Sequence, residues 1–385
     1  MRTLIFGGTL LTPEQTLPDH TLVIDGPQIA GIEPQPLRGG GAGEQMIDAR
    51  GLWVIPGLID VHIHGSSGHD VMEATPEALH SMARFLARHG VTAYFPTTCA
   101  ASSQATWAAI ENVARCPQPA DGAQHLGLHL EGPYANPEHR GAQPPEQLRL
   151  PDPDEYAAWL ANKAVRLITI APELPGALDL IERGASQGIK FAVGHSGASY
   201  EQMLAAADRG LQQATHTFNG MLGLHHREPG TAGAVLADER IYAQVIADGV
   251  HLHPAVVKVL IRAKGVGRTI LITDGMRATG VGDGEYDLGG QAIRVEGGIA
   301  RTAAGGLAGS TLTLDAAVRN AMRFAGLSLA ESVAMASAVP AEAMGLAGRK
   351  GCLAPGADAD VVLLDANLHV RLTMIAGHIV YRQTD

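Results

Sequence analysis

The middle of the chain alternates short apolar segments with alanine-rich segments, and this alternation limits the fold more than any other feature. The apolar segments are typical of buried parallel strands, and the alanine-rich segments place apolar residues at helical spacing. We expect strands at residues 58–64, 92–98, 126–131, 166–171, 190–195, 213–217, 243–248 and 269–274. We expect helices at residues 76–89, 102–115, 177–187, 199–209, 254–264, 312–326 and 330–345. Eight such strands with helices between them predict an α/β fold with a (β/α)8 TIM-like barrel, in preference to an open doubly wound sheet.

The two ends of the chain have a different pattern. They consist of short alternating strands separated by turns, for example at residues 21–25 and 359–365. Because two β-rich ends surround a different middle, we expect them to meet in space. The sequence therefore predicts a small, discontinuous β-sandwich domain of residues 1–55 and 347–385, beside a catalytic barrel domain of residues 56–346.

Composition excludes several classes of partner. The chain has a net charge of −11 and only 4% aromatic residues, which argues against nucleic acid and against a membrane surface. We find no signal-peptide pattern at its start and no apolar stretch of the about 18–20 residues that a membrane helix needs. The three cysteines, Cys99, Cys116 and Cys352, are too far apart to suggest a disulfide framework. We therefore expect a cytoplasmic protein, with Cys99 as a buried thiol rather than a nucleophile.

Histidines and acids follow several of the expected strands. His62 and His64 end the first strand, and their spacing places both imidazoles on the same face. The other residues of this kind are Glu131, His195, His216, His251 and Asp274. The carboxyl ends of barrel strands converge on one rim, so these side chains should become neighbours. Imidazole and carboxylate ligands without cysteine suit Zn²⁺ first, with Fe²⁺, Co²⁺ or Mn²⁺ as alternatives.

Two residues near these ligands have roles that the pattern leaves open. Asp274 follows a fully apolar strand, where it can cap a helix or act as a general base. We favour the base, which takes a proton from the attacking water and passes it to a leaving amine. His129, two positions before Glu131, is either a partner of the ligands or only a buried neighbour.

Four strings carry a resemblance to a known family. They are PGLIDVHIHG at 56–65, HLEGP at 129–133, HTFNGM at 216–221 and REPG at 227–230. The first string is common in the amidohydrolase superfamily. The combination of the other three resembles the N-acetylglucosamine-6-phosphate deacetylases within it, and the likeness extends over nearly the whole chain.

The resemblance implies a metal-dependent hydrolase of amino-sugar metabolism that converts N-acetylglucosamine 6-phosphate to glucosamine 6-phosphate and acetate. It implies that Glu131, His195 and His216 bind the catalytic metal and that Asp274 is the general base and acid. The expected substrate-binding residues are Gln143, Asn219, Gly220, His226, Arg227, His251, Leu307, Ala308 and Gly309. His226 and Arg227 also form a local basic cluster that suits phosphate. The family further implies a homodimer in which the Arg227 segment reaches the partner subunit.

Some alternatives remain open at this point. His62 and His64 allow a second metal ion bridged by Glu131, so one or two ions can bind. Position 143 is often histidine in the family, whereas Gln143 can donate a hydrogen bond but carries no charge, which leaves the carbonyl-polarising group open. N-acetylgalactosamine 6-phosphate is a rival substrate.

Other amidohydrolase reactions and a non-catalytic metal-binding protein are less favoured. The fourth strand carries no metal-bridging lysine, and His195 is not followed by the His-x-x-Glu pattern of many deaminases. A protein that had lost catalysis would not be expected to keep the base, Asp274.

Overall fold

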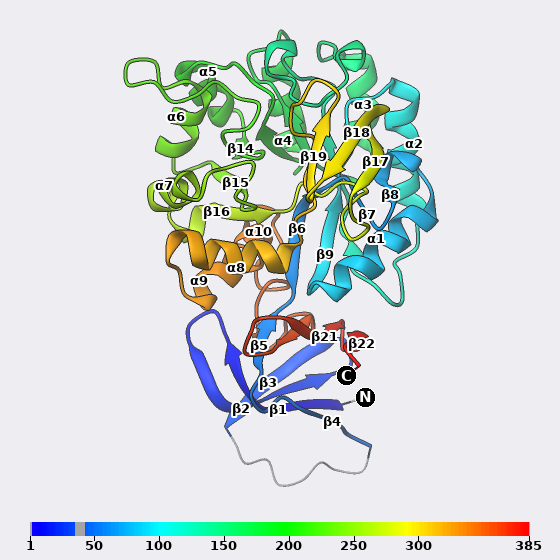
Figure 1. Cartoon of the computed structure of the whole chain (residues 1–385), viewed down its shortest axis with the longest axis vertical. Coiled ribbons are helices and arrows are strands. Elements are labelled where there is room, and N and C mark those ends of the chain that lie inside the picture. Colours follow the sequence, from blue (N-terminus) through cyan, green and yellow to red (C-terminus); the bar gives the residue numbers. More distant parts are fainter. Residues whose placement is uncertain (1, 35–42, 385) are drawn as a thin grey trace.

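The computed structural model describes residues 2–34 and 43–384. Figure 1 shows a barrel with helices around it and a β sheet below it. The barrel strands are β6 (Leu58–Ile63), β9 (Val91–Pro96), β11 (Leu128–Glu131), β12 (Val165–Ile170), β13 (Lys190–Val193), β14 (Leu211–Ala214), β15 (Tyr242–Ile246) and β16 (Thr269–Ile272). Each coincides with an expected strand to within a few residues. Nearly all of their residues are buried, because the barrel interior covers one face and the helices cover the other.

Two parallel sheets, one of six strands and one of three, make up the barrel wall. Strands β11 to β16 pair in parallel in chain order, while β9 pairs with β6 and with the short strand β10 (Gln124–His125). Isolated bridges join Thr97 to His129 and Ile63 to Gly275, which closes the wall at both seams. The predicted TIM-like barrel is thus confirmed.

Ten α-helices lie within the described residues, besides four short 3-10 helices. They are α1 (Pro76–Arg88), α2 (Ser103–Arg115), α3 (Pro153–Ala161), α4 (Ala177–Ser186), α5 (Tyr200–Asp208), α6 (Gly230–Ala237), α7 (Pro254–Lys264), α8 (Leu314–Ala325), α9 (Leu329–Ala334) and α10 (Ala338–Ala343). Side-chain caps fix several of their starts, as where Thr75 accepts a hydrogen bond from the Ala78 amide at the start of α1. None of these helices has the length and apolar character needed to cross a membrane.

The prediction of a single helix at 330–345 is wrong, because the chain forms the two helices α9 and α10 there. Pro340 has no amide hydrogen to donate, and its ring would clash with the carbonyl four residues earlier in a continuous helix. The chain turns at Ser337, whose φ is −140°. The helices α3 and α6 were not expected from the sequence.

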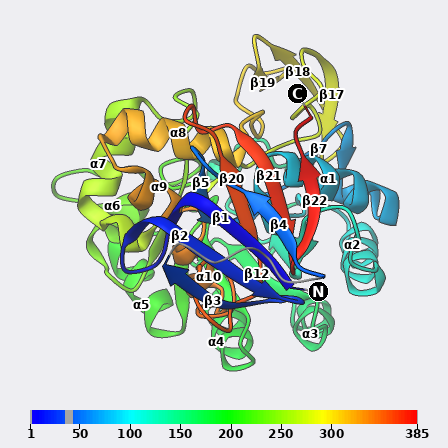
Figure 2. The ribbon, with the colours of Figure 1, turned by 90° about the horizontal axis from the view of Figure 1, so that it is seen from below.

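The two ends of the chain form one sheet of eight strands. Seven pair in the order β22 (His378–Arg382), β21 (Val370–Ile375), β20 (Val361–Leu364), β5 (Trp53–Pro56), β1 (Arg2–Leu11), β2 (Thr16–Asp25) and β3 (Gln28–Pro34), and β4 (Gln45–Asp48) pairs with β1. Figure 2 shows the N-terminal and C-terminal strands side by side across the base of the barrel. The small β domain from both termini is therefore confirmed as part of the fold class, while its exact boundaries and its sandwich form stay predictions.

A three-stranded antiparallel sheet stands on the barrel after the last strand. It consists of β17 (Gly284–Leu288), β18 (Gln291–Glu296) and β19 (Ile299–Thr302). Its apolar side chains pack on Cys99, Met276 and Ala308 in a separate small core. Two further strands, β7 (Gly65–Ser66) and β8 (His69–Asp70), form a short hairpin just after β6.

Candidate metal centre and active site

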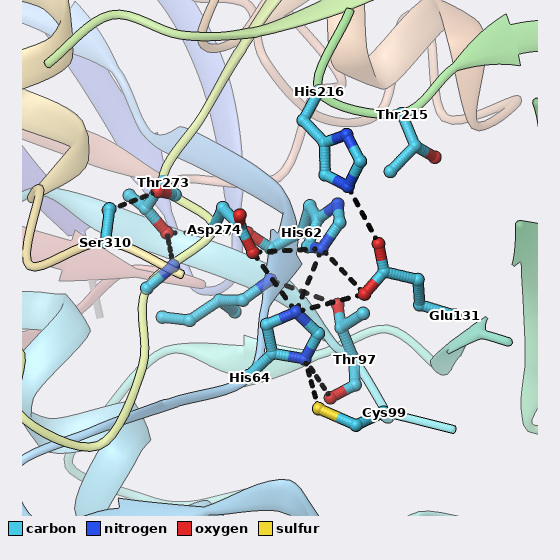
Figure 3. Close-up of polar contacts among 12 residues, drawn as sticks. His62, His64, Thr97, Cys99, Glu131, Thr215, His216, Thr273, Asp274 and Ser310 are labelled. Carbon is cyan, nitrogen blue, oxygen red and sulfur yellow. Dashed lines mark hydrogen bonds and ion pairs between the residues drawn. The ribbon is translucent and has the colours of Figure 1, made fainter. Parts of the chain in front are cut away.

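The barrel gathers five of the predicted ligands at the carboxyl ends of its strands. One group of possible ligand atoms comes from His62, His64 and Glu131, and a second comes from Glu131, His195 and His216. Within each group the ligand atoms lie within 4.8 Å of one another, and all five side chains are buried. Glu131 belongs to both groups, so its carboxylate joins them (Figure 3).

The two oxygens of the Glu131 carboxylate face different histidines. Oε1 lies 3.1 Å from Nε2 of His195 and 3.0 Å from Nε2 of His216. Oε2 lies 3.2 Å from Nε2 of His64 and 3.7 Å from Nε2 of His62. One carboxylate can therefore serve two adjacent metal positions with one oxygen each.

Backbone carbonyls favour one tautomer of three of these histidines, with the proton on Nδ1. Nδ1 of His64, His195 and His216 each lies within hydrogen-bond distance of a carbonyl oxygen, which can only accept. The acceptors are Thr97, His139 and Asn219, at 3.2, 3.1 and 3.1 Å. A proton on Nδ1 leaves the Nε2 lone pair free to bind a metal. Because these lone pairs point toward carboxylate oxygens, the donor set fits a divalent cation between them.

His62 is held in a different way. Its Nδ1 has no hydrogen-bond partner among the described residues. Its ring packs edge-on against His129, with 4.8 Å between the ring centroids. His129 itself bonds to the Val61 carbonyl and to the Thr169 hydroxyl, at 3.0 and 2.7 Å. His129 thus contacts the centre through the His62 ring and makes no hydrogen bond to a ligand.

The electrostatics of the centre favour positive charge. Burial lowers the pKa of His62, but the negative charges of Glu131 and Asp274 raise it more, to about 9. Burial raises the pKa of Glu131, whereas the surrounding histidines lower it further, well below its usual range. A bound cation would supply the positive charge that these carboxylates attract.

Three of the predicted functional residues have an unusual backbone conformation. His195, His216 and Asp274 have φ values of 50°, 30° and 50°, in the left-handed region that side chains other than glycine rarely adopt. Such strain persists only where the surrounding structure holds it in place, and it is concentrated at functional sites. Six other described residues, such as Ala74 and Leu368, share this conformation, so the strain agrees with the side-chain geometry without identifying the site by itself.

Asp274 faces the first pair of histidines. Its Oδ1 lies 3.1 Å from Nε2 of His64 and 3.3 Å from Nε2 of His62 (Figure 3). On the other side, the Ser310 amide donates to the Asp274 carbonyl at 2.7 Å. The carboxylate therefore reaches the ligand cluster while its backbone is fixed by the loop that follows the β17–β19 sheet.

Asp60, for which no role was expected from the sequence, lies at the seam between β6 and β16. Its carboxylate accepts hydrogen bonds from the Thr273 hydroxyl at 2.6 Å, the Thr273 amide at 3.4 Å and the His62 amide at 3.2 Å. It thus links the residue before Asp274 to His62. A carboxylate inside an otherwise apolar strand was the available signal, since acids are rarely fully buried without partners.

A cavity of about 230 Å³ opens onto the ligand cluster. Besides the ligands and Asp274, it is lined by the predicted substrate residues Gln143, Asn219, Gly220, His251, Leu307 and Gly309. Gly220 has a φ of 59°, and a Cβ there would lie 2.9 Å from Nδ1 of His195, so a larger residue would collide with a ligand. His251 is oriented by Asp248, whose Oδ2 lies 2.7 Å from its Nδ1.

The remaining predicted substrate residues lie elsewhere. Ala308 is buried in the small core behind the cavity wall. His226 and Arg227 are exposed on the loop before α6 and do not line the cavity, and their side chains contact each other at 2.7 Å. Cys99 is buried, with Sγ 3.5 Å from Nδ1 of His64. Burial raises the pKa of the Cys99 thiol, which disfavours the thiolate that a nucleophile needs.

The fold and this centre agree with the comparison to known families. The sequence pattern of the amidohydrolase family matches residues 53–380. The chain belongs to the amidohydrolase family, whose members are metal-dependent hydrolases.

Within this family the chain is similar to sugar-phosphate deacetylases. It is 43% identical over 374 residues to N-acetylgalactosamine-6-phosphate deacetylase of Escherichia coli O157:H7. This match covers 96% of this chain and 97% of that protein. It is also 41% identical over 331 residues to N-acetylglucosamine-6-phosphate deacetylase of Vibrio furnissii. This second match covers 85% of this chain and 83% of that protein. The resemblance inferred from the motifs is thus confirmed.

Solved structures extend the likeness to the whole fold. A mutant N-acetyl-D-glucosamine-6-phosphate deacetylase from Mycobacterium smegmatis, in complex with N-acetyl-D-glucosamine 6-phosphate, is 34% identical with a TM-score of 0.91. The match covers 98% of this chain and 99% of that one. The Pasteurella multocida enzyme of the same name is 27% identical with a TM-score of 0.94, and both chains are covered completely.

Proposed function

We propose that this enzyme hydrolyses N-acetylglucosamine 6-phosphate to glucosamine 6-phosphate and acetate, as a step in amino-sugar metabolism. The observation that carries the proposal is the meeting of Glu131, His195, His216 and Asp274 at one cavity. Relatives that are 41% and 34% identical carry the name of this activity, and the latter was solved with this sugar phosphate bound.

The catalytic metal in this proposal is held by Glu131, His195 and His216. Zn²⁺ is the first choice for this donor set, and Fe²⁺, Co²⁺ or Mn²⁺ would also suit it. His62 and His64, together with Glu131, would hold the second ion if the centre binds two. A bound ion of this kind activates water and polarises a carbonyl oxygen.

Asp274 performs the proton transfers. Its carboxylate takes a proton from the water that attacks the acetyl carbonyl and then passes this proton to the amine nitrogen of the departing sugar. In the metal-free centre, burial raises the pKa of Asp274, and the charges and hydrogen bonds of His62 and His64 lower it further. A cation bound in their place would also favour the ionised carboxylate. It therefore starts the reaction as an acceptor.

The sugar phosphate is held by residues at the mouth of the cavity. Asn219, Gly220 and His251 line the cavity beside the ligands. Arg227 and His226 lie outside the cavity of their own subunit, and they would supply the basic cluster for the phosphate in the partner subunit's site. We propose a homodimer in which this exposed loop lies near the partner subunit's site. The exposed Leu224 on the same loop gives the interface an apolar contact.

N-acetylgalactosamine 6-phosphate is the second candidate substrate. The relative that is 43% identical over 96% of the chain is named for that activity. The two sugars differ in the orientation of one hydroxyl group, so the same metal centre and base would act on either.

The test is acetate release from the purified protein with each of the two N-acetylated hexosamine 6-phosphates. We expect turnover that stops when a chelator removes the metal and returns when Zn²⁺ is added back. The ratio of kcat/KM for the two epimers identifies the preferred sugar. Equal turnover of N-acetylglucosamine without phosphate would contradict the phosphate site, and no acetate release from any of them would contradict the proposed function.

We also propose a cytoplasmic location. The three cysteines, Cys99, Cys116 and Cys352, are all free, as expected in a reducing compartment.

A further inference from the structure

The loop after β11 holds two of the metal ligands from outside the barrel. The Asn136 amide donates to the His195 carbonyl at 2.8 Å, and the His139 carbonyl accepts from Nδ1 of His195 at 3.1 Å. Further along the same loop, Gln143 reaches Glu131. The loop thus orients one histidine ligand and the shared carboxylate together.

The Gln143 side chain is held at both of its polar ends. Its Oε1 accepts a hydrogen bond from the Ala100 amide at 2.7 Å, and its Nε2 donates to Oε2 of Glu131 at 2.9 Å. The Ala100 amide can only donate and the carboxylate can only accept, so the Gln143 amide has one permitted orientation. Its side chain is buried, with a relative exposure of 6% for the residue.

This hydrogen bond selects one rotation of the Glu131 carboxylate. Oε2 is the oxygen that faces His64, while Oε1 faces His195 and His216. Rotation of the carboxylate would break the bond to Gln143 and leave a buried amide nitrogen without an acceptor, which is costly. Gln143 therefore maintains the division of the two oxygens between the two groups of histidines.

We propose that Gln143 is a positioning residue, which acts through Glu131 to set the metal affinity of the centre. The proposal rests on the proposed function only for its kinetic readout. The Gln143 oxygen and one of its two N–H groups are engaged by the protein, so the side chain cannot turn away without breaking its bond to Glu131. Hydrogen-bond partners of metal ligands typically contribute about 10–100-fold in metal affinity or activity.

The test compares two substitutions of Gln143 with a matched control. Gln143→Glu keeps the size and the acceptor for the Ala100 amide but places a carboxylate against Glu131. Gln143→Met keeps the volume and removes both hydrogen bonds. Gln147→Glu makes the same chemical change as the first variant in the same loop, at a side chain that lies away from the ligands.

The first readout is Co²⁺ binding to metal-free protein, measured by competition with a chromophoric chelator, together with the visible spectrum of the bound cobalt. We expect both Gln143 variants to bind Co²⁺ at least about tenfold more weakly, with an altered spectrum, while Gln147→Glu matches the wild type. In the kinetic readout, kcat should fall while KM changes by less than about twofold. Circular dichroism and Tm identify any variant that fails to fold, in which case the other decides.

Wild-type cobalt affinity and spectrum in both variants, with a raised KM, would overturn the proposal and make Gln143 a substrate contact. The same cobalt affinity with a fall in kcat alone would also overturn it, because that result assigns Gln143 to the chemical step. The cobalt titration needs no substrate, so it judges the proposal even if the protein releases no acetate from either sugar phosphate.

Discussion

Single residues at this centre combine strain with charge. Asp274 lies on left-handed backbone, and its carboxylate contacts two histidines that lower its pKa. Such strain persists only where the surrounding contacts hold the residue in place, and it is found mostly at functional sites. Single substitutions therefore test the proposed catalytic roles.

The first prediction concerns the base. Asp274→Asn keeps the shape of the side chain but removes its ability to accept a proton. We expect kcat to fall by roughly 10²–10⁴-fold, as is typical of a lost general base. Metal content and Tm, measured on the same sample, should remain close to the wild type. Near-normal turnover in this variant would remove the role from Asp274.

The second prediction concerns the number of metal ions. If His62 and His64 hold a second ion, elemental analysis should find two ions per chain in the wild type. His62→Ala should lose one of them and retain the ion bound by His195 and His216. One tightly bound ion per chain in both proteins would contradict the second position.

Among the secondary-structure elements, hydrogen bonds between distant residues close the barrel where its first and last strands share few ladder pairs. The strands β6 and β16 meet at a seam with an isolated bridge between Ile63 and Gly275. The buried Asp60 carboxylate reaches across this seam to Thr273. Backbone bonds also cross the seam, such as that from the Asp274 amide to the His62 carbonyl at 2.9 Å. The seam therefore carries His62 on one side and Asp274 on the other, and the Asp60 side chain adds to its backbone pairing.

The third prediction tests this seam. Asp60→Asn replaces one acceptor oxygen with an amide donor, which then faces donors at Thr273 or His62. We expect the free energy of unfolding to fall by about 1–3 kcal/mol, because a buried donor is left without an acceptor. Urea denaturation measures the change, and kcat should fall with it. Thr273→Val, which removes one of the three hydrogen bonds, should have a smaller effect, and an Asp60→Asn protein as stable and active as the wild type would rule out this role.

The fourth prediction concerns the contact between α8 and the end of α1. Burial raises the pKa of Asp315, but the hydrogen bond and charge of His89, together with Arg319, lower it further, well below its usual value. A carboxyl group whose pKa is lower in the folded state stabilises that state above its unfolded pKa, and this contribution is lost as the pH falls. Asp315→Asn should therefore cost about 1–3 kcal/mol at pH 7.

The pH dependence separates this electrostatic effect from a packing defect. The stability difference between wild type and Asp315→Asn should shrink as the pH falls below about 4, the unfolded pKa of an aspartate. Chemical denaturation at a series of pH values measures it. A difference that stays constant down to pH 3 would assign the effect to packing instead.

At the scale of the whole molecule, a buried lysine connects the barrel to the terminal sheet. Nζ of Lys350 lies 2.7 Å from Oδ2 of Asp360, just before β20, and 3.0 Å from Oε1 of Gln124 in β10. Lys350 and Asp360 are only 2% and 3% exposed, so neither charge is solvated. We propose that residues 1–55 and 347–385 form a domain distinct from residues 56–346, and the hydrogen bond from Lys350 to Gln124 crosses between the two.

The fifth prediction follows from this burial. Lys350→Met leaves the buried Asp360 carboxylate without its cation and also removes the contact of Nζ with Asp358 at 3.0 Å, and we expect a loss of about 3–5 kcal/mol in the free energy of unfolding. Arg349→Met is the control, because it removes only the surface pair of Arg349 with Asp358, and such pairs contribute less than about 1 kcal/mol. Equal effects of the two substitutions in a thermal melt would contradict the importance of the buried pair.

The strands and the residues at their ends were predictable because their signal is local. Apolar segments with helices between them indicate βα units, and barrel closure then brings distant ends such as His62 and His216 to one rim. The β17–β19 sheet was not predictable, since its strands interrupt the βα alternation and pack on residues as distant as Cys99. The roles of Asp60 and Gln143 could not be predicted either, because each depends on hydrogen-bond partners elsewhere in the chain.

The sequence by itself determined the fold class, the family and the residue types available for the metal centre, because periodicity and motifs are properties of neighbouring residues. Only the tertiary structure decided which oxygen of Glu131 faces which histidine, which nitrogen of each imidazole is left free, and which loop orients them. These features arise from hydrogen bonds between segments far apart in the chain, such as that between Gln143 and Glu131, and their geometry exists only once the barrel has closed.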